Sequence, residues 1–448
     1  MITTRCIFLT VLGLLSMVAW AQERPDQSSL DTLNWDEIRY AAFHSDTISM
    51  ENWRSFSLPV NTMVDSRAGV RVRQNAATGS NFSYELDGLN SVSYFLDGLP
   101  IRYMGSAMQI NNMPTALLDK VEVFKGVTPV YLGSDGLGGT VNMVTRKVDS
   151  SFISASYAYG SFNTQQAHLQ GQWTNKRSGF TVKAMTYFTD AENNYEIDVD
   201  VPNQTGFIER ISAERFNDDF RSLFGKIDLG FTNVSWADEL FVGLVVSDLE
   251  EGIQTGSDLA IPLGDVQRDE EFLMPAITYK KNDIFVKGLS LDLFGSYAMT
   301  KRTFTDTSSF VYNWRGERIL TRAFPGELVN GGSLNEVEDK ALIVRVFPQF
   351  QFSDDHKIVL NYTLEDLERE SEDEFNPLPF SSEPTKYTTH TAGLGWQGNW
   401  LQGRLYSNLF AKYFRFNSSA TQMAFAGSQE LEGDDSQVGF GLATSYKI

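Results

Sequence analysis

Cysteine is nearly absent from this chain of 448 residues, which contains only Cys6. A single cysteine cannot form an intramolecular disulfide or a thiolate metal centre. Histidine is also scarce, and the four histidines lie far apart without the spacing of paired metal ligands (His44, His168, His356 and His390). No Gly-x-Ser-x-Gly motif of a hydrolase nucleophile occurs. We therefore expect no metal site, no cofactor and no enzymatic activity.

Long apolar runs are missing after residue 21, and so is any excess of positive charge. No run approaches the roughly 20 apolar residues that a membrane-spanning helix needs. If the chain crosses a bilayer, it must do so as a closed β-barrel, because only helices and closed barrels satisfy their backbone hydrogen bonds in lipid. The formal net charge of −20 argues against a nucleic-acid partner, which would require a basic surface.

The N-terminus has the features of a cleaved secretory signal peptide. Arg5 supplies a positive charge, residues 7–18 form a short apolar core, and Ala19-Trp20-Ala21 matches the cleavage signal. The apolar run is too short for a membrane anchor, and a buried N-terminal helix is the alternative. We predict that residues 1–21 are a signal peptide and that the chain leaves the cytoplasm.

The remaining chain divides into three regions by composition. Residues 22–59 are polar and weakly patterned, and we interpret them as a tether. Residues 60–148 combine short apolar runs with many glycines, which predicts a small α/β domain. Over residues 149–448, apolar and polar side chains alternate along many segments. The predicted fold class is therefore mainly β, with a small α/β domain followed by a large antiparallel sheet.

The alternation in residues 149–448 is typical of transmembrane β-strands. Leu223, Ile227 and Leu229, for example, fall on one face of a strand, and polar residues separate them. Roughly twelve such segments occur, each close to the 9–11 residues that a tilted transmembrane strand needs. The pattern predicts a sheet with one apolar face toward lipid.

The connections between these segments alternate in length. Short links lie near residues 174–179, 233–238, 282–288, 353–356 and 399–403, and long acidic links lie near residues 190–219, 248–271, 305–339, 367–386 and 417–436. Only the first link, near residues 160–163, is short where a long one is due. Short periplasmic turns and long external loops characterise outer-membrane barrels, so we predict an antiparallel transmembrane β-barrel over residues 149–448.

Four motifs occur in order within residues 69–147. They begin at Gly69, Tyr94, Val121 and Tyr131 and read GVRVR, YFLDGLP, VEVFKGV and YLGSDGLGGTVNMVT. In this order and spacing they resemble the plug domain of TonB-dependent outer-membrane receptors. The resemblance implies that residues 60–148 form a plug inside the barrel.

Two pairs of motif residues have a physical interpretation. Asp97 and Gly98 read as a tight turn after a strand, in which Asp97 bonds its own backbone and Gly98 adopts a positive φ. Glu122 and Lys125 flank an apolar strand, where they can make charge-assisted bonds to barrel-wall residues. A solvated pair of little energetic weight is the alternative for Glu122 and Lys125.

Glycines are frequent in the last two motifs. They include Gly126, Gly133, Gly138 and Gly139. The last three allow the chain to fold tightly just before the first barrel strand. This segment lacks the Gly-Lys-Ser/Thr ending of a phosphate-binding loop. One departure from the family is Asp87, which stands where an arginine is usual, so an ion pair made by that arginine would be absent or reversed.

The resemblance also implies an energy-coupling segment, the TonB box, in the tether at residues 22–59. Asp46, Thr47 and Ile48 loosely match this segment. Residues 31–35 match it equally loosely. An ordinary tether sequence is the alternative for both stretches.

A size comparison predicts a barrel wider than twelve strands. A plug of about 90 residues has an envelope radius of about 16 Å, scaled from its expected radius of gyration. Twelve strands spaced by about 4.7 Å and tilted by about 40° close at a backbone radius of only about 12 Å. Twenty-two strands, as in plugged outer-membrane transporters, give about 22 Å. We therefore expect about ten further strands beyond those in this sequence.

By this resemblance, the chain is expected to be a receptor and transporter in the outer membrane of a Gram-negative bacterium. The expected partners are TonB, outer-membrane lipid with lipopolysaccharide, and a scarce small solute such as a siderophore-iron complex, haem or cobalamin. Arg102, Tyr103 and Met104 are expected to lie on the outward plug face and to bind that solute. The alternatives are a passive porin-like or structural barrel, which the plug motifs disfavour, and a secreted β-rich enzyme, which the sorted loops disfavour.

Overall fold

The computed structural model describes residues 45–448 except 54–58, 75–77, 80–81, 134–137, 147–149, 203–205, 256–258, 260, 377–383, 425–426 and 447. The described residues belong to one compact unit that spans residues 40–448. The predicted signal peptide at residues 1–21 and the TonB-box candidate at residues 31–35 lie outside the described residues.

The N-terminal part is a small α/β domain, the plug, built on a five-stranded sheet. The sheet order is β1-β6-β7-β4-β5, with bounds Ser45–Ser49, Leu118–Lys125, Gly139–Thr145, Val92–Leu96 and Leu99–Pro100. Strands β4 and β7 run parallel, and the other neighbours are antiparallel. The described part of the plug also contains one α-helix, one separate hairpin and four short 3₁₀ helices. The helix is α3 (Val60–Asp65), and the hairpin pairs β2 (Val70–Gln74) with β3 (Phe82–Leu86). The 3₁₀ helices are η1 (Glu51–Trp53), η2 (Ser106–Met108), η3 (Thr115–Leu117) and η4 (Val130–Leu132). Strand β1 is part of this sheet, although it lies upstream of residue 60, the domain boundary that the composition predicts.

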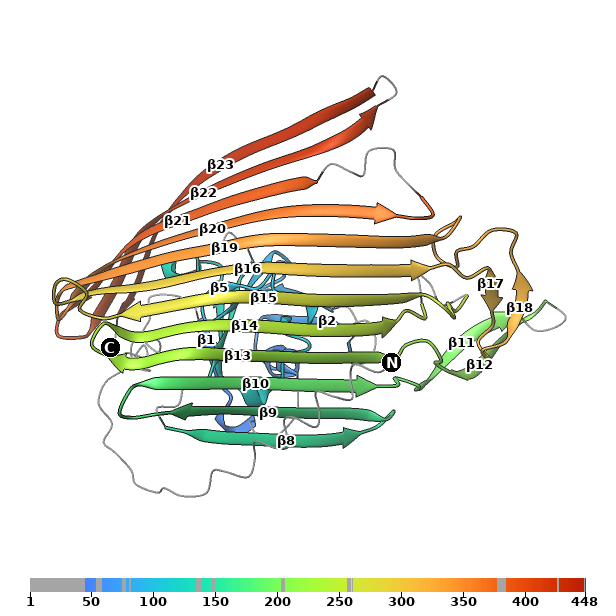
Figure 1. Cartoon of the computed structure of the whole chain (residues 1–448), viewed down its shortest axis with the longest axis horizontal. Coiled ribbons are helices and arrows are strands. Elements are labelled where there is room, and N and C mark those ends of the chain that lie inside the picture. The colour runs from blue at the N-terminus through green and yellow to red at the C-terminus, as the bar shows by residue number, and fades with distance from the viewer. Residues whose placement is uncertain are drawn as a thin grey trace. The chain divides into compact units, whose positions relative to one another are not determined.

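The larger part is one antiparallel sheet of twelve strands, here called the wall, as the alternation predicted. Its strands in sheet order are β8 (Phe152–Gly160), β9 (Thr164–Thr174), β10 (Phe180–Ala191), β13 (Phe220–Val234), β14 (Ala237–Gly252), β15 (Gln267–Lys281), β16 (Leu289–Asp306), β19 (Ser333–Ser353), β20 (His356–Asp373), β21 (Thr385–Trp400), β22 (Leu405–Ala424) and β23 (Gly427–Tyr446). Figure 1 shows these strands side by side, and in the described part of the chain β8 and β23 are the two edges.

The two faces of the wall differ as the sequence pattern predicted. On β13, Leu223, Ile227 and Leu229 are exposed, whereas Ser222 and Phe224, on either side of Leu223, are buried. A strand places successive side chains on opposite faces, so the exposed set forms one apolar surface. The buried set faces the plug, which contributes to the same apolar core as Phe224.

Several wall strands are longer than expected, and one predicted loop is wrong. Strand β19 has 21 residues. The predicted long link at 417–436 is instead strand, because β22 and β23 stay paired up to Ala424 and Gly427. Its acidic residues are compatible with a strand outside lipid, since Asp434 pairs across the strands with Arg415 at 3.1 Å.

Two of the long connections contain hairpins of their own. They are β11 (Glu196–Pro202) with β12 (Ile208–Glu214), and β17 (Phe310–Tyr312) with β18 (Arg318–Thr321). Both hairpins lie beyond the same end of the sheet, at the right of Figure 1. Val199 and Ala213 pack with Trp314 in one buried cluster, which ties the two connections together. Among the described residues, no helix has the length and apolar character to cross a membrane.

Candidate ligand-binding site between plug and wall

The plug and the wall share one apolar core. Ile101, Met104 and Met108 of the plug are buried with Phe272 and Ile343 of the wall. These side chains come from the turn after β5 and from η2 on one side, and from β15 and β19 on the other. Burial of apolar surface favours this contact, so the segment from Leu99 to Met108 is held firmly against the wall.

Wall side chains also donate hydrogen bonds to backbone carbonyls of the plug. Arg345 Nη2 donates to the carbonyl of Tyr131 at 2.7 Å, and Asn361 Nδ2 donates to that of Val130 at 3.0 Å. Lys412 Nζ donates to the carbonyl of Thr128 at 2.6 Å. On the far side of the plug, Gln170 Nε2 donates to Ala116 at 3.0 Å, and the Tyr187 hydroxyl donates to Ala107. These bonds attach the plug backbone to wall side chains. The Val130 carbonyl also accepts the Gly133 N–H within the plug, so the wall adds a second donor there.

The segment after β5 makes two further polar contacts with the wall. Arg102 forms a two-pronged ion pair with Glu365 of β20, in which Nε lies 2.8 Å from Oε1 and Nη2 bonds Oε2. The hydroxyl of Ser106 donates to Glu270 Oε2 of β15 at 2.8 Å. Two parallel N–H···O bonds fix the orientation of a guanidinium as well as its position. Nothing in the sequence marks Glu365 or Glu270 beyond their place on the inner face of a strand.

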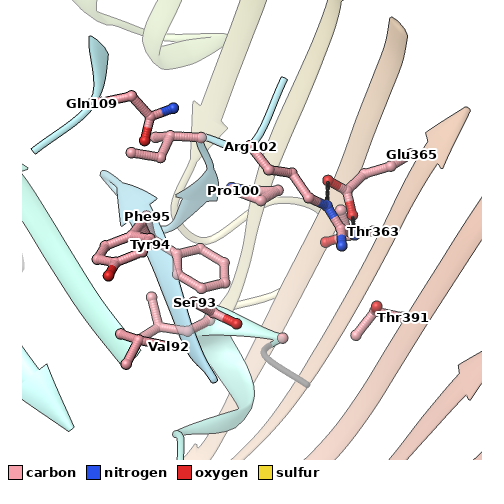
Figure 2. A pocket seen from close by; sticks show the side chains of 13 residues that line it. Val92, Ser93, Tyr94, Phe95, Pro100, Arg102, Gln109, Thr363, Glu365 and Thr391 are labelled. Carbon is pink, nitrogen blue, oxygen red and sulfur yellow. Dashed lines mark hydrogen bonds and ion pairs between the residues drawn. The ribbon is translucent and has the colours of Figure 1, made fainter. Parts of the chain in front are cut away.

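A cavity of about 340 Å³ lies between the plug and the wall beside this ion pair. Figure 2 shows Arg102 reaching from the plug to Glu365 of β20, with Thr363 on the same strand and Thr391 on the neighbouring strand β21. The cavity is lined by Val92, Ser93, Tyr94, Phe95, Pro100, Ile101, Arg102, Gln109, Leu132, Gly133, Thr363, Glu365 and Thr391. The lining combines apolar side chains with a similar share of polar and charged ones, which can fix the orientation of a small molecule by hydrogen bonds.

The three residues predicted to bind ligand occupy different environments. Arg102 lines the cavity. Tyr103 is partly buried against the apolar core, and burial raises the pKa of its phenol, which therefore stays neutral. Met104 is buried within that core and is not among the residues that line the cavity.

Asp97 and Gly98 form a tight turn between β4 and β5, as predicted. Their φ angles are 51° and 77°, which is the backbone of a primed hairpin turn. The Asp97 carboxylate does not bond its own backbone, however. It accepts the backbone N–H of Thr145 at 2.9 Å and the Thr145 hydroxyl at 2.6 Å. The turn is thereby attached to the end of β7.

Glu122 and Lys125 bond within the plug rather than to the wall. Glu122 is buried, pairs with Lys120 at 2.7 Å, and accepts hydrogen bonds from Asn142 at 2.8 Å and Tyr131 at 3.2 Å. Lys125 donates to the carbonyl of Ala68. The expected wall contact is not found because β6 lies inside the sheet between β1 and β7, where its side chains meet plug neighbours first.

The motif glycines lie at chain reversals around β6 and β7. Gly126 follows β6, Gly138 precedes β7, and Gly139 begins it. Gly133 has a φ of 57°, and a Cβ there would lie 2.8 Å from Asn361 Nδ2 of the wall. This glycine therefore permits both the backbone turn and the close approach of η4 to β20.

The TonB-box candidate at Asp46, Thr47 and Ile48 lies in β1. Its register places Thr47 opposite Glu122 and Ile48 opposite Val121. Ile48 is fully buried in the plug core. The Ile48 side chain can reach another protein only if β1 leaves the sheet.

Comparison with known proteins identifies the plug. Residues 42–140 match the family model described as TonB-dependent Receptor Plug Domain. This chain has the plug and the fold of a TonB-dependent receptor. Strand β1 belongs to the matched range, although it lies before residue 60.

Solved TonB-dependent receptor structures share the whole arrangement of plug and wall. The copper transporter OprC matches with a TM-score of 0.66 and 12% identity, over 90% of this chain and 60% of that one. The pyoverdine outer membrane receptor FpvA from Pseudomonas aeruginosa PAO1 matches with 0.64 and 14%, over 92% and 61%. The ferric citrate transporter FecA matches with 0.61 and 14%, over 92% and 62%. This chain thus spans about three fifths of the length of these structures, which are transporters and receptors rather than enzymes.

Proposed function

We propose that this protein is a TonB-dependent transporter of the outer membrane of a Gram-negative bacterium. A scarce solute binds on the outward side of the plug, beside Arg102 and Tyr103, and crosses after the plug has rearranged. TonB supplies the energy through the N-terminal segment. Lipid and lipopolysaccharide surround the wall, whose exposed apolar face suits a bilayer.

The main support for this proposal is the cavity between plug and wall, which the Arg102–Glu365 ion pair helps to line. The plug fills the space that an open pore would need, so passage requires the plug to move. One contact of the Leu99–Met108 segment lies near a strand end that carries a long connection, because Glu270 is the fourth residue of β15 after such a connection. The contact with Glu365 lies near the middle of β20. We infer that a solute arriving from the side of the long connections meets this segment.

The solute belongs to the range taken up by such transporters, including siderophore-iron complexes, haem and cobalamin. The matched structures are named for copper, pyoverdine and ferric citrate, which are three different cargoes. At 12–14% identity they share the fold, and the cargo of this chain is a separate question.

Uptake measurements in matched strains test the transport role. The protein is expressed in cells with and without TonB, and accumulation of labelled siderophore-iron, haem and cobalamin is followed. We expect at least one of these solutes to accumulate only when both this protein and TonB are present. Equal uptake without TonB would instead support the passive porin-like alternative.

A reversible crosslink tests the coupling through β1. Ile48→Cys together with Val121→Cys places two thiols at paired positions of β1 and β6, in a chain whose one native cysteine, Cys6, lies in the predicted signal peptide. If β1 must leave the sheet, oxidation stops uptake and reduction restores it. Each single cysteine variant serves as the control. Undiminished uptake by the oxidised double variant would show that β1 stays in place.

A further inference from the structure

Two arginines on the inner face of the wall converge on one carboxylate. Arg369 of β20 bonds Asp339 of β19 in two-pronged fashion, with Nε at 2.6 Å from Oδ1 and Nη2 at 2.8 Å from Oδ2. Arg302 of β16 bonds the same Oδ2 through Nη2. The three strands are adjacent in the sheet. One carboxylate therefore faces two guanidinium groups and neutralises only half of their charge.

The cluster lies on the outward side of the plug. Arg302 and Arg369 each stand four residues before the end of their strands, Asp306 and Asp373, where long connections begin. Both arginines share a face with side chains of the plug-wall core, since Ala298 and Leu367 are members of that core. The cluster thus lines the inner wall between the plug and the long connections.

The positive groups of this cluster are exposed, and the negative groups lie beneath them. The side chains of Arg302 and Arg369 are 34% and 40% exposed, against 9% for Asp339. The neighbouring ion pair repeats this arrangement, with Arg102 43% and Glu365 4% exposed. A solute entering from the long connections therefore meets three guanidinium groups above two buried carboxylates.

Two tyrosines accompany these ion pairs. Tyr103 lies beside Arg102, whose guanidinium carbon is 5.4 Å from the centre of its ring. Its phenol can donate a further hydrogen bond to an anion. Tyr387 stacks on Phe416 and pairs across the strands with Leu367, two residues before Arg369, so it adds an aromatic side chain near the cluster.

We propose that Arg102, Arg302 and Arg369 form the recognition site for an anionic solute that offers carboxylate groups. The guanidinium fork matches a carboxylate in two-pronged geometry, and these arginines already hold carboxylates in that way. A solute carboxylate can therefore bond the exposed N–H groups or replace Asp339 or Glu365 as a partner. The place of this site in uptake rests on the proposed transport function, whereas the binding itself does not.

Binding to the purified full chain in detergent tests the proposal, with citrate as the probe. Calorimetric titration compares the wild type with Arg302→Gln, Arg369→Gln and the double variant. We expect each single change to weaken citrate binding roughly 5- to 10-fold, as loss of a charge-assisted bond predicts, and the double variant to lose more than either. Raised salt weakens binding of the wild type, because the site is partly exposed.

The matched control is Arg415→Gln on the opposite face of the wall. Arg415 is similarly exposed, at 46%, and is likewise ion-paired, with Asp434. It shares the face of the exposed Leu409 and Tyr413, away from the plug. We expect its affinity for citrate to equal that of the wild type. The double variant Arg302→Lys with Arg369→Lys keeps the charge but not the fork, and is expected to bind more tightly than the double glutamine variant.

Four outcomes overturn the proposal: no saturable citrate binding, equal loss in Arg415→Gln, unchanged binding in the double glutamine variant, or equal binding by the two double variants. Preferential binding of neutral glucose or cationic spermidine also overturns it. Arginine-dependent citrate binding without TonB-dependent uptake of any solute leaves the site standing and defeats the transport function. TonB-dependent uptake combined with citrate binding that does not depend on the arginines defeats the proposed site and leaves the transport function standing.

Discussion

Polar side chains have different roles in the plug and on the part of the wall that faces η4. In the plug, Glu122 and Asp97 bond to other plug residues, and so hold the domain together from within. In the wall, Arg345 and Asn361 bond outward from their own sheet, to plug carbonyls. The central strands of the plug are therefore held together by the plug's own side chains. The contact between plug and wall depends on wall donors and on Arg102 and Ser106 of the plug.

The largest expected effect comes from breaking the internal network of the plug. Glu122→Ala removes the buried carboxylate that pairs with Lys120 and accepts from Asn142, and removal of one member of a buried pair costs about 3–5 kcal/mol. Urea unfolding of the plug, followed by protease cleavage within residues 60–140 of the full chain, measures this cost. Glu122→Gln keeps the hydrogen-bonding shape and is expected to lose less. An unchanged urea midpoint for the alanine variant would contradict the internal role of Glu122.

Breaking the retaining bonds of the wall is expected to have a different result. Arg345→Ala removes a charge-assisted hydrogen bond to the Tyr131 carbonyl, at a cost of about 1.5–3 kcal/mol. Asn361→Ala removes a neutral bond to the Val130 carbonyl, at a cost of about 1 kcal/mol, because that carbonyl still accepts the Gly133 N–H. We expect faster amide hydrogen exchange around η4 while exchange in β6 and β7 stays slow. Equal acceleration in the central plug strands would mean that plug and wall unfold together, and the contrast between them would fail.

The Arg102–Glu365 pair sharpens the comparison, because its two members are buried unequally. Arg102→Ala leaves a buried carboxylate without its partner and is expected to cost about 1–3 kcal/mol. Glu365→Gln leaves a half-exposed guanidinium that water can solvate, at a cost under about 1 kcal/mol. Thermal unfolding of the two variants and of the double variant measures the difference. Equal losses in both single variants would indicate that burial does not set the cost.

The smallest effect is expected on the exposed face of the wall. Arg415→Ala removes an ion pair between two exposed side chains, and such pairs contribute under about 1 kcal/mol. The same thermal measurement is expected to show almost no shift. A shift as large as that of Arg102→Ala would assign β22 and β23 a stabilising role that their exposure does not suggest.

The wall was predictable from the sequence, since period-two alternation survives in nearly every strand. The spacing of Leu223, Ile227 and Leu229 alone predicts the exposed face of β13. The prediction failed at residues 417–436, where charged residues resemble a loop but pair across β22 and β23. Charge excludes a lipid-facing strand, but it does not exclude a strand that continues beyond the bilayer.

The site was less predictable than the fold. The sequence predicts Arg102 as a ligand-binding residue because it follows the YFLDGLP motif, but it does not predict Glu365, Arg302 or Asp339. Each of these three is one polar residue on an inward face, and alternation cannot tell which of many such residues meets a partner. Their association depends on the register of β16, β19 and β20, which sequence periodicity leaves open.

The use of backbone carbonyls as the acceptors for Arg345, Asn361 and Lys412 bears on how the two parts evolve. A carbonyl is present whatever side chain follows it, so substitutions at Thr128, Val130 or Tyr131 keep these acceptors as long as the backbone path is kept. The wall residues have no such freedom, because each donor is a specific side chain. Plug side chains at these positions can therefore change while an unchanged wall continues to bind the plug backbone.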